Sequence, residues 1–276
     1  MSPRRRFPAG PGALLSSAWN NRGLIRQLTR REIVGRYRGS ILGILWPFLN
    51  PMILLAVYTF VFSVVFKVRW GGTGPEDKTA FAVVLFTGMI VYGLFSECLS
   101  RAPGLVVGNP NYVKKVVFPL EILPWVSLCA SLFHMSVGVG VLLCFQVATR
   151  FGPHPTAFLL PLVIAPLALL TMGLSWFIAS MGVYVRDVGQ TVALVLTVLM
   201  FASPVFYPIA SVPERYRPLV LLNPLTFPIE QTRNVVVWGK APDLAGLALY
   251  TAASALVALL GFAWFQRTRT GFADVL

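Results

Sequence analysis

Charged residues are scarce in this sequence of 276 residues. Asp, Glu, Lys and Arg together make up only 12% of the chain, and only ten residues are acidic. Soluble proteins carry roughly 25% charged residues, so this composition excludes an ordinary soluble domain. Hydrophobic residues reach 56%. The composition predicts an all-α integral membrane protein, because long apolar runs cross a bilayer as helices.

Cysteine and histidine are also rare, with three and two residues. Cys98, Cys129 and Cys144 lie far apart in apolar segments and show no metal-ligand spacing. His134 stands in an apolar run with no acidic residue nearby in sequence, which favours a packing role, and neither an HExxH nor a GxSxG pattern occurs. We therefore predict no catalytic residue, no metal ligand and no enzymatic activity in this chain.

The cations are more numerous and give a net charge of +13. In a soluble protein this charge would suggest nucleic acid. Here many cations flank apolar runs, as in membrane proteins whose basic loops set their orientation. We expect membrane lipid and no nucleic acid as a partner.

The uncharged runs predict six membrane-spanning helices, since a span needs about 20 mostly apolar residues. The predicted spans are 41–66, 80–100, 117–148, 157–183, 189–206 and 244–265. They make up one transmembrane domain, 41–265, which follows a tail and interface helix in 1–40 and precedes a short tail in 266–276.

The distribution of lysine and arginine predicts the orientation. If the N-terminus lies in the cytosol, most of these residues fall on the cytosolic side, so the positive-inside rule places both termini there. Pro8, Gly10, Pro11 and Gly12 interrupt the apolar part of the N-terminus, which is expected to be a retained tail instead of a signal peptide.

An amphipathic interface helix is expected just before the first span. Arg22, Arg26 and Arg30 recur at every fourth position and would share one face, while Leu24, Ile25 and Leu28 gather on another. Such a helix can rest among anionic headgroups with its apolar face in the membrane boundary. The same surface could instead dock a partner protein.

The loop 105–119, between the second and third spans, predicts a short cytosolic helix. Asn109 or Asn111 could cap this helix, Lys114 and Lys115 would lie in its last turns, and Pro119 would end it. A short stiff helix between two spans can act as a lever. Glu121 follows directly and is expected to pair with Lys115 or Arg101, because a carboxylate in lipid is costly.

The segment 203–240 contains six prolines and cannot form one straight helix. It is too apolar for an aqueous loop, and irregular backbone at membrane depth must be buried or line a wet cavity. A re-entrant hairpin that forms an outer gate fits this constraint, and the family resemblance described below implies that this gate is periplasmic. Pro224 lies in this region, and Glu230 and Arg233 are spaced for a local ion pair.

The sequence shows no energy source of its own. GTGPEDKT at 72–79 resembles a phosphate-binding loop, but Asp77 replaces an essential glycine. Glu97, Glu121 and His134 are the only candidates for proton coupling, and the halves of the chain show no obvious inverted repeat, which disfavours a proton-coupled carrier. We therefore expect a permease driven by a separate ATPase.

Several stretches resemble the permease subunit of bacterial polysaccharide ABC exporters, most closely the O-antigen type. They are LTRREIVGRYRGSILGILWPFLNP, AVYTFVFSVVFKVRW, NYVKKVVFPLEILP, YVRDVGQ and NPLTFPIEQTRN. The resemblance implies a homodimer in the bacterial inner membrane, bound to two nucleotide-binding subunits that use ATP and magnesium. It also implies export of undecaprenyl-pyrophosphate-linked polysaccharide. Permeases for capsule, teichoic acid, or a small lipid or drug remain alternatives.

This resemblance suggests roles for particular residues. Arg36 and Arg38 could capture the lipid pyrophosphate, because guanidinium groups match phosphate oxygens. The aromatic residues Tyr58, Tyr92, Phe201, Phe206 and Tyr207 could line a sugar channel, since sugar ring faces stack on aromatic rings. The expected coupling residues are Asn109, Asn111, Tyr112, Lys114 and Lys115, and the expected gate residues are Pro224, Glu230 and Arg233.

Overall fold

The computed structural model describes residues 10–61, 78–114, 118–149 and 152–276, and the regular structure in these ranges is helical. Lys115, the end of the predicted first span and most of the GTGPEDKT segment lie outside the described residues. The helices are α1 (Pro11–Asn20), α2 (Arg22–Tyr37), α3 (Trp46–Tyr58), α4 (Lys78–Arg101), α5 (Gly104–Val107), α6 (Pro110–Lys114), α7 (Leu123–Ala148), α8 (Leu160–Tyr184), α9 (Val188–Ala202), α10 (Arg217–Leu222), α11 (Thr226–Val236), α12 (Leu244–Thr268) and α13 (Phe272–Val275).

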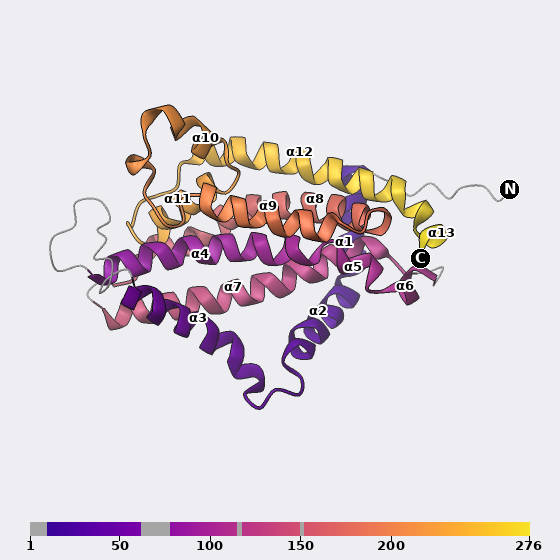
Figure 1. The fold of residues 1–276 in the computed structure, drawn as a ribbon, viewed down its shortest axis with the longest axis horizontal. Helices are drawn as coiled ribbons and strands as arrows, with labels where there is room; N and C mark the ends of the chain where they lie inside the picture. Colours follow the sequence, from indigo (N-terminus) through magenta and orange to yellow (C-terminus); the bar gives the residue numbers. More distant parts are fainter. Residues whose placement is uncertain (1–9, 62–77, 115–117, 150–151) are drawn as a thin grey trace.

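Four helical stretches are long and apolar enough to cross a membrane: Ala80–Arg101, Leu120–Ala148, Pro155–Tyr184 and Leu244–Val275. They coincide with the second, third, fourth and sixth predicted spans and lie side by side in one bundle (Figure 1). The other two predicted spans correspond to shorter apolar helices, Trp46–Val61 and Val188–Ala202. The molecule is therefore an all-helical membrane protein, in which six crossings stay a prediction.

The predicted start of the first span is wrong. The chain leaves α2 at Arg38 and turns before α3 begins at Trp46, so α2 and α3 form a V beside the bundle (Figure 1). Gly39 and Gly43 have φ angles of 87° and 47°, in the left-handed region that favours glycine. Pro47 then occupies the first turn of α3, where its missing N–H has no helical partner to lose.

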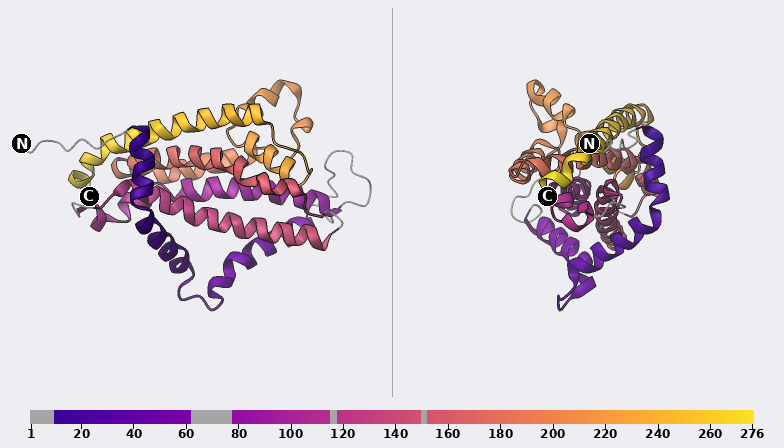
Figure 2. Two further views of the ribbon diagram at one scale, coloured as in Figure 1. Left: turned by 180° about the vertical axis from the view of Figure 1, so that it is seen from behind. Right: turned by 90° about the vertical axis from the view of Figure 1, so that its right-hand side faces the viewer.

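The fifth predicted span ends early, at Ala202 instead of residue 206. Ser203 has extended backbone angles, φ −90° and ψ 151°, because the ring of Pro204 disfavours a helical conformation in the residue before it. The chain beyond consists of short helices, as the prolines predict, and α10 and α11 lie at the end of the bundle opposite α6 and α13 (Figures 1 and 2).

The helices α8 and α12 make the most extensive contact in the bundle, and glycine allows their close approach. A Cβ atom added at Gly173 would lie 2.5 Å from the carbonyl oxygen of Val257, and one at Gly261 would collide with the backbone of Gly173. Small residues permit such backbone contact between helices in a membrane. The crossing point of α8 and α12 therefore requires glycine at both positions.

We expect Gly261→Ala to lower the free energy of unfolding by about 3 kcal/mol, because the added methyl group has no space. The measurement is the midpoint of thermal unfolding of the purified protein, monitored as the loss of the folded peak in size-exclusion chromatography. Gly189→Ala is the matched control, since a Cβ at Gly189 meets no atom within 4 Å. An equal midpoint for both variants would contradict the assigned packing.

Candidate functional site

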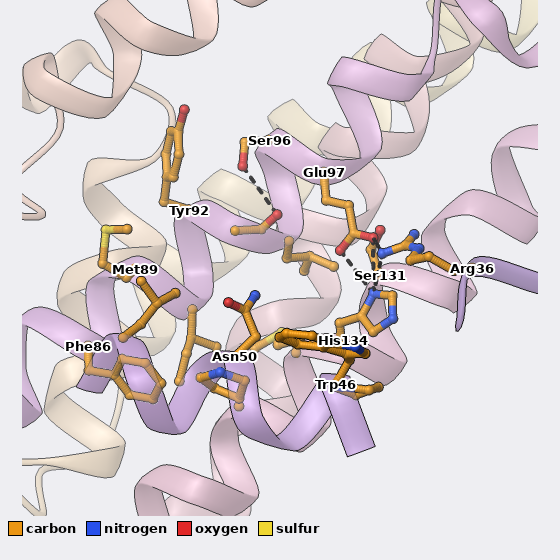
Figure 3. A pocket seen from close by; sticks show the side chains of 18 of the residues that line it. Arg36, Trp46, Asn50, Phe86, Met89, Tyr92, Ser96, Glu97, Ser131 and His134 are labelled. Atoms are coloured by element: carbon orange, nitrogen blue, oxygen red, sulfur yellow. Dashed lines mark hydrogen bonds and ion pairs between the residues drawn. The ribbon is translucent and has the colours of Figure 1, made fainter. Parts of the chain in front are cut away.

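A groove of about 690 Å³ lies between the end of α2 and the helices α3, α4 and α7. Its lining is more polar than that of two other grooves in the described part of the molecule. Its lining includes polar groups at one end and apolar and aromatic groups along its length (Figure 3). Among its lining residues are Arg36, Tyr37, Trp46, Tyr58, Phe86, Tyr92, Glu97 and His134.

Four side chains meet at the polar end of this groove. Arg36 Nη1 lies 2.6 Å from Glu97 Oε1, and His134 Nδ1 lies 3.0 Å from the same carboxylate oxygen. The hydroxyl of Tyr37 lies 3.1 Å from His134 Nε2. Figure 3 shows the Arg36, Glu97 and His134 side chains pointing toward one another from three different helices. This cluster therefore ties α2 to α4 and α7.

Hydrogen-bonding rules fix part of the protonation pattern in the cluster. A carboxylate only accepts hydrogen bonds, so in this contact His134 Nδ1–H is the donor and Glu97 is the acceptor. Glu97 thus receives donors from both His134 and Arg36. Because Arg36 contacts this cluster through Nη1 alone, the rest of its guanidinium fork is available to a ligand in the groove.

The walls of the groove carry aromatic rings. Trp46 stands near His134 at the polar end, and Phe86 lies toward the other end (Figure 3). Tyr58 and Tyr92 also line the groove, and their role in a sugar channel stays a prediction. The Tyr92 hydroxyl donates a 2.8 Å hydrogen bond to the carbonyl of Leu196, which fixes its ring between α4 and α9.

The other three predicted lining residues gather elsewhere, where α9 ends. Phe201 and Phe206 stack with ring centroids 5.8 Å apart, and the Tyr207 hydroxyl donates to the carbonyl of Phe201. These rings do not line the groove between α3, α4 and α7. Arg38, the second predicted headgroup residue, is exposed at the end of α2 and also lies outside the groove lining.

The predicted interface helix exists as α2, but its apolar face was assigned to the wrong neighbour. Ile25 and Leu28 are buried against Ile122 and Val126, so they contact protein instead of lipid. A second ion pair, between Glu32 and Arg101 at 2.6 Å, joins α2 to the end of α4. The start of α7 and the residue before it thus provide the apolar surface that covers this face of α2.

Residues of the predicted coupling loop form α5 and α6. Asn109 precedes α6 and its side chain donates to the Leu105 carbonyl at 3.0 Å, while Asn111 is exposed. The Tyr112 hydroxyl accepts a 2.7 Å hydrogen bond from Arg31, and this contact links α6 to α2. Lys114 ends α6. The short helix is as predicted, and its coupling role stays a prediction.

Glu121 was expected to pair with Arg101 or Lys115; the pairing with Arg101 was wrong, and Lys115 lies outside the described residues. Glu121 forms an ion pair with Arg269, which also donates to the carbonyl of Phe118 at 2.8 Å. Arg101 is instead paired with Glu32. Arg269 follows α12 directly, and the return of that helix to the α6 end brings its guanidinium to Glu121.

In the predicted gate region, the Glu230–Arg233 ion pair is confirmed at 2.7 Å. The Arg233 side chain is only 1% exposed and also donates to the carbonyls of Val84 and Val205, at 3.2 and 2.9 Å. The Pro224 carbonyl accepts a hydrogen bond from Tyr250. These contacts fix the segment after α9 to α4 and α12.

Comparison with known proteins agrees with this architecture. Residues 23–237 match the family model of the ABC-2 type transporters. The chain is 29% identical to the O-antigen export system permease protein RfbA of Myxococcus xanthus, over 95% of this chain and 98% of that protein. It is 25% identical to the polysialic acid transport protein KpsM of Escherichia coli, over 85% of this chain and 90% of KpsM. A Klebsiella pneumoniae RfbA is 22% identical over 92% of this chain and 95% of that protein.

The family match covers more than half of the chain and includes α2 through α11, which contain the groove and the short helices after α9. Such proteins are the membrane components of transporters and contain no catalytic domain, in agreement with the predicted lack of an enzymatic site. The chain belongs to the ABC-2 type transporter family.

Proposed function

We propose that this protein is the permease subunit of an ATP-driven exporter that moves a lipid-linked polysaccharide from the cytosol to the periplasm. It would work in the bacterial inner membrane as a dimer with two nucleotide-binding subunits. The similarity to polysaccharide permeases over most of their length supports the substrate class. The observation that carries the proposal is the groove between α3, α4 and α7.

This groove combines the two features that a glycolipid pyrophosphate needs. The aromatic rings of Trp46 and Tyr58 offer stacking surfaces for sugars. Arg36, at the polar end, offers a guanidinium that Glu97 holds in place. Phosphate oxygens fit such a fork through paired, charge-assisted hydrogen bonds. Arg38 would assist from the adjacent surface.

The contacts of α6 support a proposed route for coupling to ATP hydrolysis. A nucleotide-binding subunit that grips α6 would pull on α2 through the Tyr112–Arg31 hydrogen bond. Because α2 carries Arg36, its motion would reach the groove directly. In this proposal Asn109, Asn111, Lys114 and Lys115 contribute to the gripped surface, and the segment that contains Pro224, Glu230 and Arg233 acts as the periplasmic gate.

Both ends of the described chain, α1 and α13, lie at the α6 end of the bundle (Figure 1). An even number of crossings has this property, and it supports the proposed six spans with both termini in the cytosol. O antigen is the proposed cargo, because the Myxococcus permease aligns over nearly its whole length. The matches to capsule permeases make a capsular polysaccharide the second candidate.

The test uses inverted membrane vesicles that contain this protein and the nucleotide-binding subunit with which it purifies. We expect ATP-dependent entry of undecaprenyl-pyrophosphate-linked glycan into the vesicle lumen, measured as protection from an added glycosidase. An ATPase-inactive partner should abolish this entry. Uptake driven by a proton gradient without ATP would refute the proposal, and so would ATP hydrolysis by the isolated permease.

A further inference from the structure

A second groove, of about 560 Å³, lies beside α2 and shares no lining residue with the polysaccharide groove proposed above. It is bounded by the end of α1, by α2 and by α7. Its lining residues are Ala18, Arg22, Ile25, Arg26, Thr29, Arg30, Ile33, Val34 and Cys129. The groove thus combines three arginines with a mainly apolar floor.

The three arginines follow one line along α2. They are separated by four residues each, or about 6 Å along the helix axis. All three are exposed. No ion pair between residues that the structure describes involves Arg22, Arg26 or Arg30. Arg22 contacts α1 instead, where its guanidinium lies 4.9 Å from the ring centre of Trp19. This row therefore presents uncompensated positive charge.

The other charged residues of α2 contrast with this row. Arg31 binds Tyr112, Glu32 binds Arg101 and Arg36 binds Glu97, so these three side chains are engaged with α6 and α4. The helix thus has one set of charges that holds it to the protein and another set that lines an open groove.

We propose that this groove is a binding site for an anionic phospholipid. The phosphate would lie along the arginine row, and the first part of an acyl chain would cover Ile33 and Val34. A free phosphate ion would gain nothing from the apolar floor. A phospholipid satisfies both parts, and each cation near an anionic surface contributes about 1 kcal/mol.

Occupancy of this site would affect transport, because α2 also contacts α6 and carries Arg36. A bound lipid would hold the N-terminal half of α2 while its C-terminal half moves. This proposal does not rest on the identity of the cargo, since it concerns lipid binding to the permease itself.

The experiment measures lipid binding to the purified, delipidated full-length protein by native mass spectrometry. Phosphatidylglycerol and phosphatidylcholine are titrated separately, and inorganic phosphate is added as a competitor. We expect the wild type to bind phosphatidylglycerol at least tenfold more tightly than phosphatidylcholine. The triple variant R22Q/R26Q/R30Q should lose at least fivefold of its phosphatidylglycerol affinity, and R22K/R26K/R30K should keep most of it.

A matched control removes the same charge elsewhere. R186Q/R215Q/R267Q changes three other exposed arginines and should leave phosphatidylglycerol affinity unchanged. Equal loss in both triple variants would overturn the site in favour of a general charge effect. Equal binding of the two lipids by the wild type would overturn the proposal, as would displacement of phosphatidylglycerol by millimolar inorganic phosphate. Circular dichroism of each variant verifies that it is folded.

Discussion

Replacing Arg233 with methionine is expected to lower the free energy of unfolding by about 3 kcal/mol. The side chain is almost completely buried between α11, α4 and the segment after α9. Methionine fills a similar volume but provides no donor, so the carbonyls of Val84 and Val205 would lose their hydrogen bonds inside the protein. A buried polar group without a partner costs about 1–3 kcal/mol, and Glu230 would lose its partner as well.

The measurement is equilibrium unfolding of the purified protein in mixed micelles of detergent and SDS. Arg217→Met is the control, because Arg217 is 40% exposed and its Glu214 partner is 89% exposed. An exposed ion pair contributes less than about 1 kcal/mol. If the two variants unfolded alike, Arg233 would not be the anchor of the region after α9.

A second variant tests the same anchor from the side of α4. A Cβ at Gly88 would lie 3.0 Å from Arg233 Nη2 and 3.4 Å from the Cα of Val205. Gly88→Ala should therefore push the guanidinium off its carbonyls and reproduce part of the Arg233→Met loss. Unchanged stability would mean that the side chain has room to shift.

Much of the helical architecture could be predicted from the sequence, because it depends on local signals. Uncharged runs of sufficient length predicted four long apolar helices. Three of them agree with the structure within three residues at each end, and the helical stretch of the sixth predicted span continues past residue 265 to Val275. Proline gave the short helices after α9, since its effect on the backbone is local. The V between α2 and α3 was missed, because Gly43 was included in the first predicted span and Gly39, just before it, was not recognised as a turn residue.

The charged contacts could not be predicted in the same way. Glu121 was expected to pair with cations nearby in sequence, but its partner Arg269 lies close to the C-terminus. His134 was read as a packing residue because no acidic residue is near it in sequence, yet Glu97 reaches it from α4. Such pairs depend on how helices are placed in space, which periodicity within one helix does not determine.

One signal in the sequence could have revealed the contact between α2 and α4. Glu32 and Arg36 are four residues apart, and so are Glu97 and Arg101. Each set shares one face of its helix. The charges are arranged so that antiparallel pairing matches them, Glu32 with Arg101 and Arg36 with Glu97, and both pairs have a distance of 2.6 Å. These two pairs form a ladder of matched geometry.

This ladder allows a prediction that separates a structural clamp from a binding residue. Reversing one member of either pair, in E32R, R101E, R36E or E97R, is expected to lower ATP-driven export at least tenfold, because like charges would then face each other. The swap E32R/R101E should restore export to within about threefold of wild type. The only proposed role of the Glu32–Arg101 pair is to hold α2 on α4, and a reversed ion pair does this equally well.

The swap R36E/E97R is expected to remain at least tenfold below wild type, although it also restores an ion pair. It would move the cation from α2 to α4 and turn a carboxylate toward the groove, where it would repel a pyrophosphate. His134 would face a cation in place of the carboxylate that accepts its proton. Export into inverted vesicles is measured together with basal ATP hydrolysis and the amount of assembled complex, which should be equal for the two swaps. Full recovery by R36E/E97R would show that Arg36 is a second clamp and that the phosphate group is bound elsewhere.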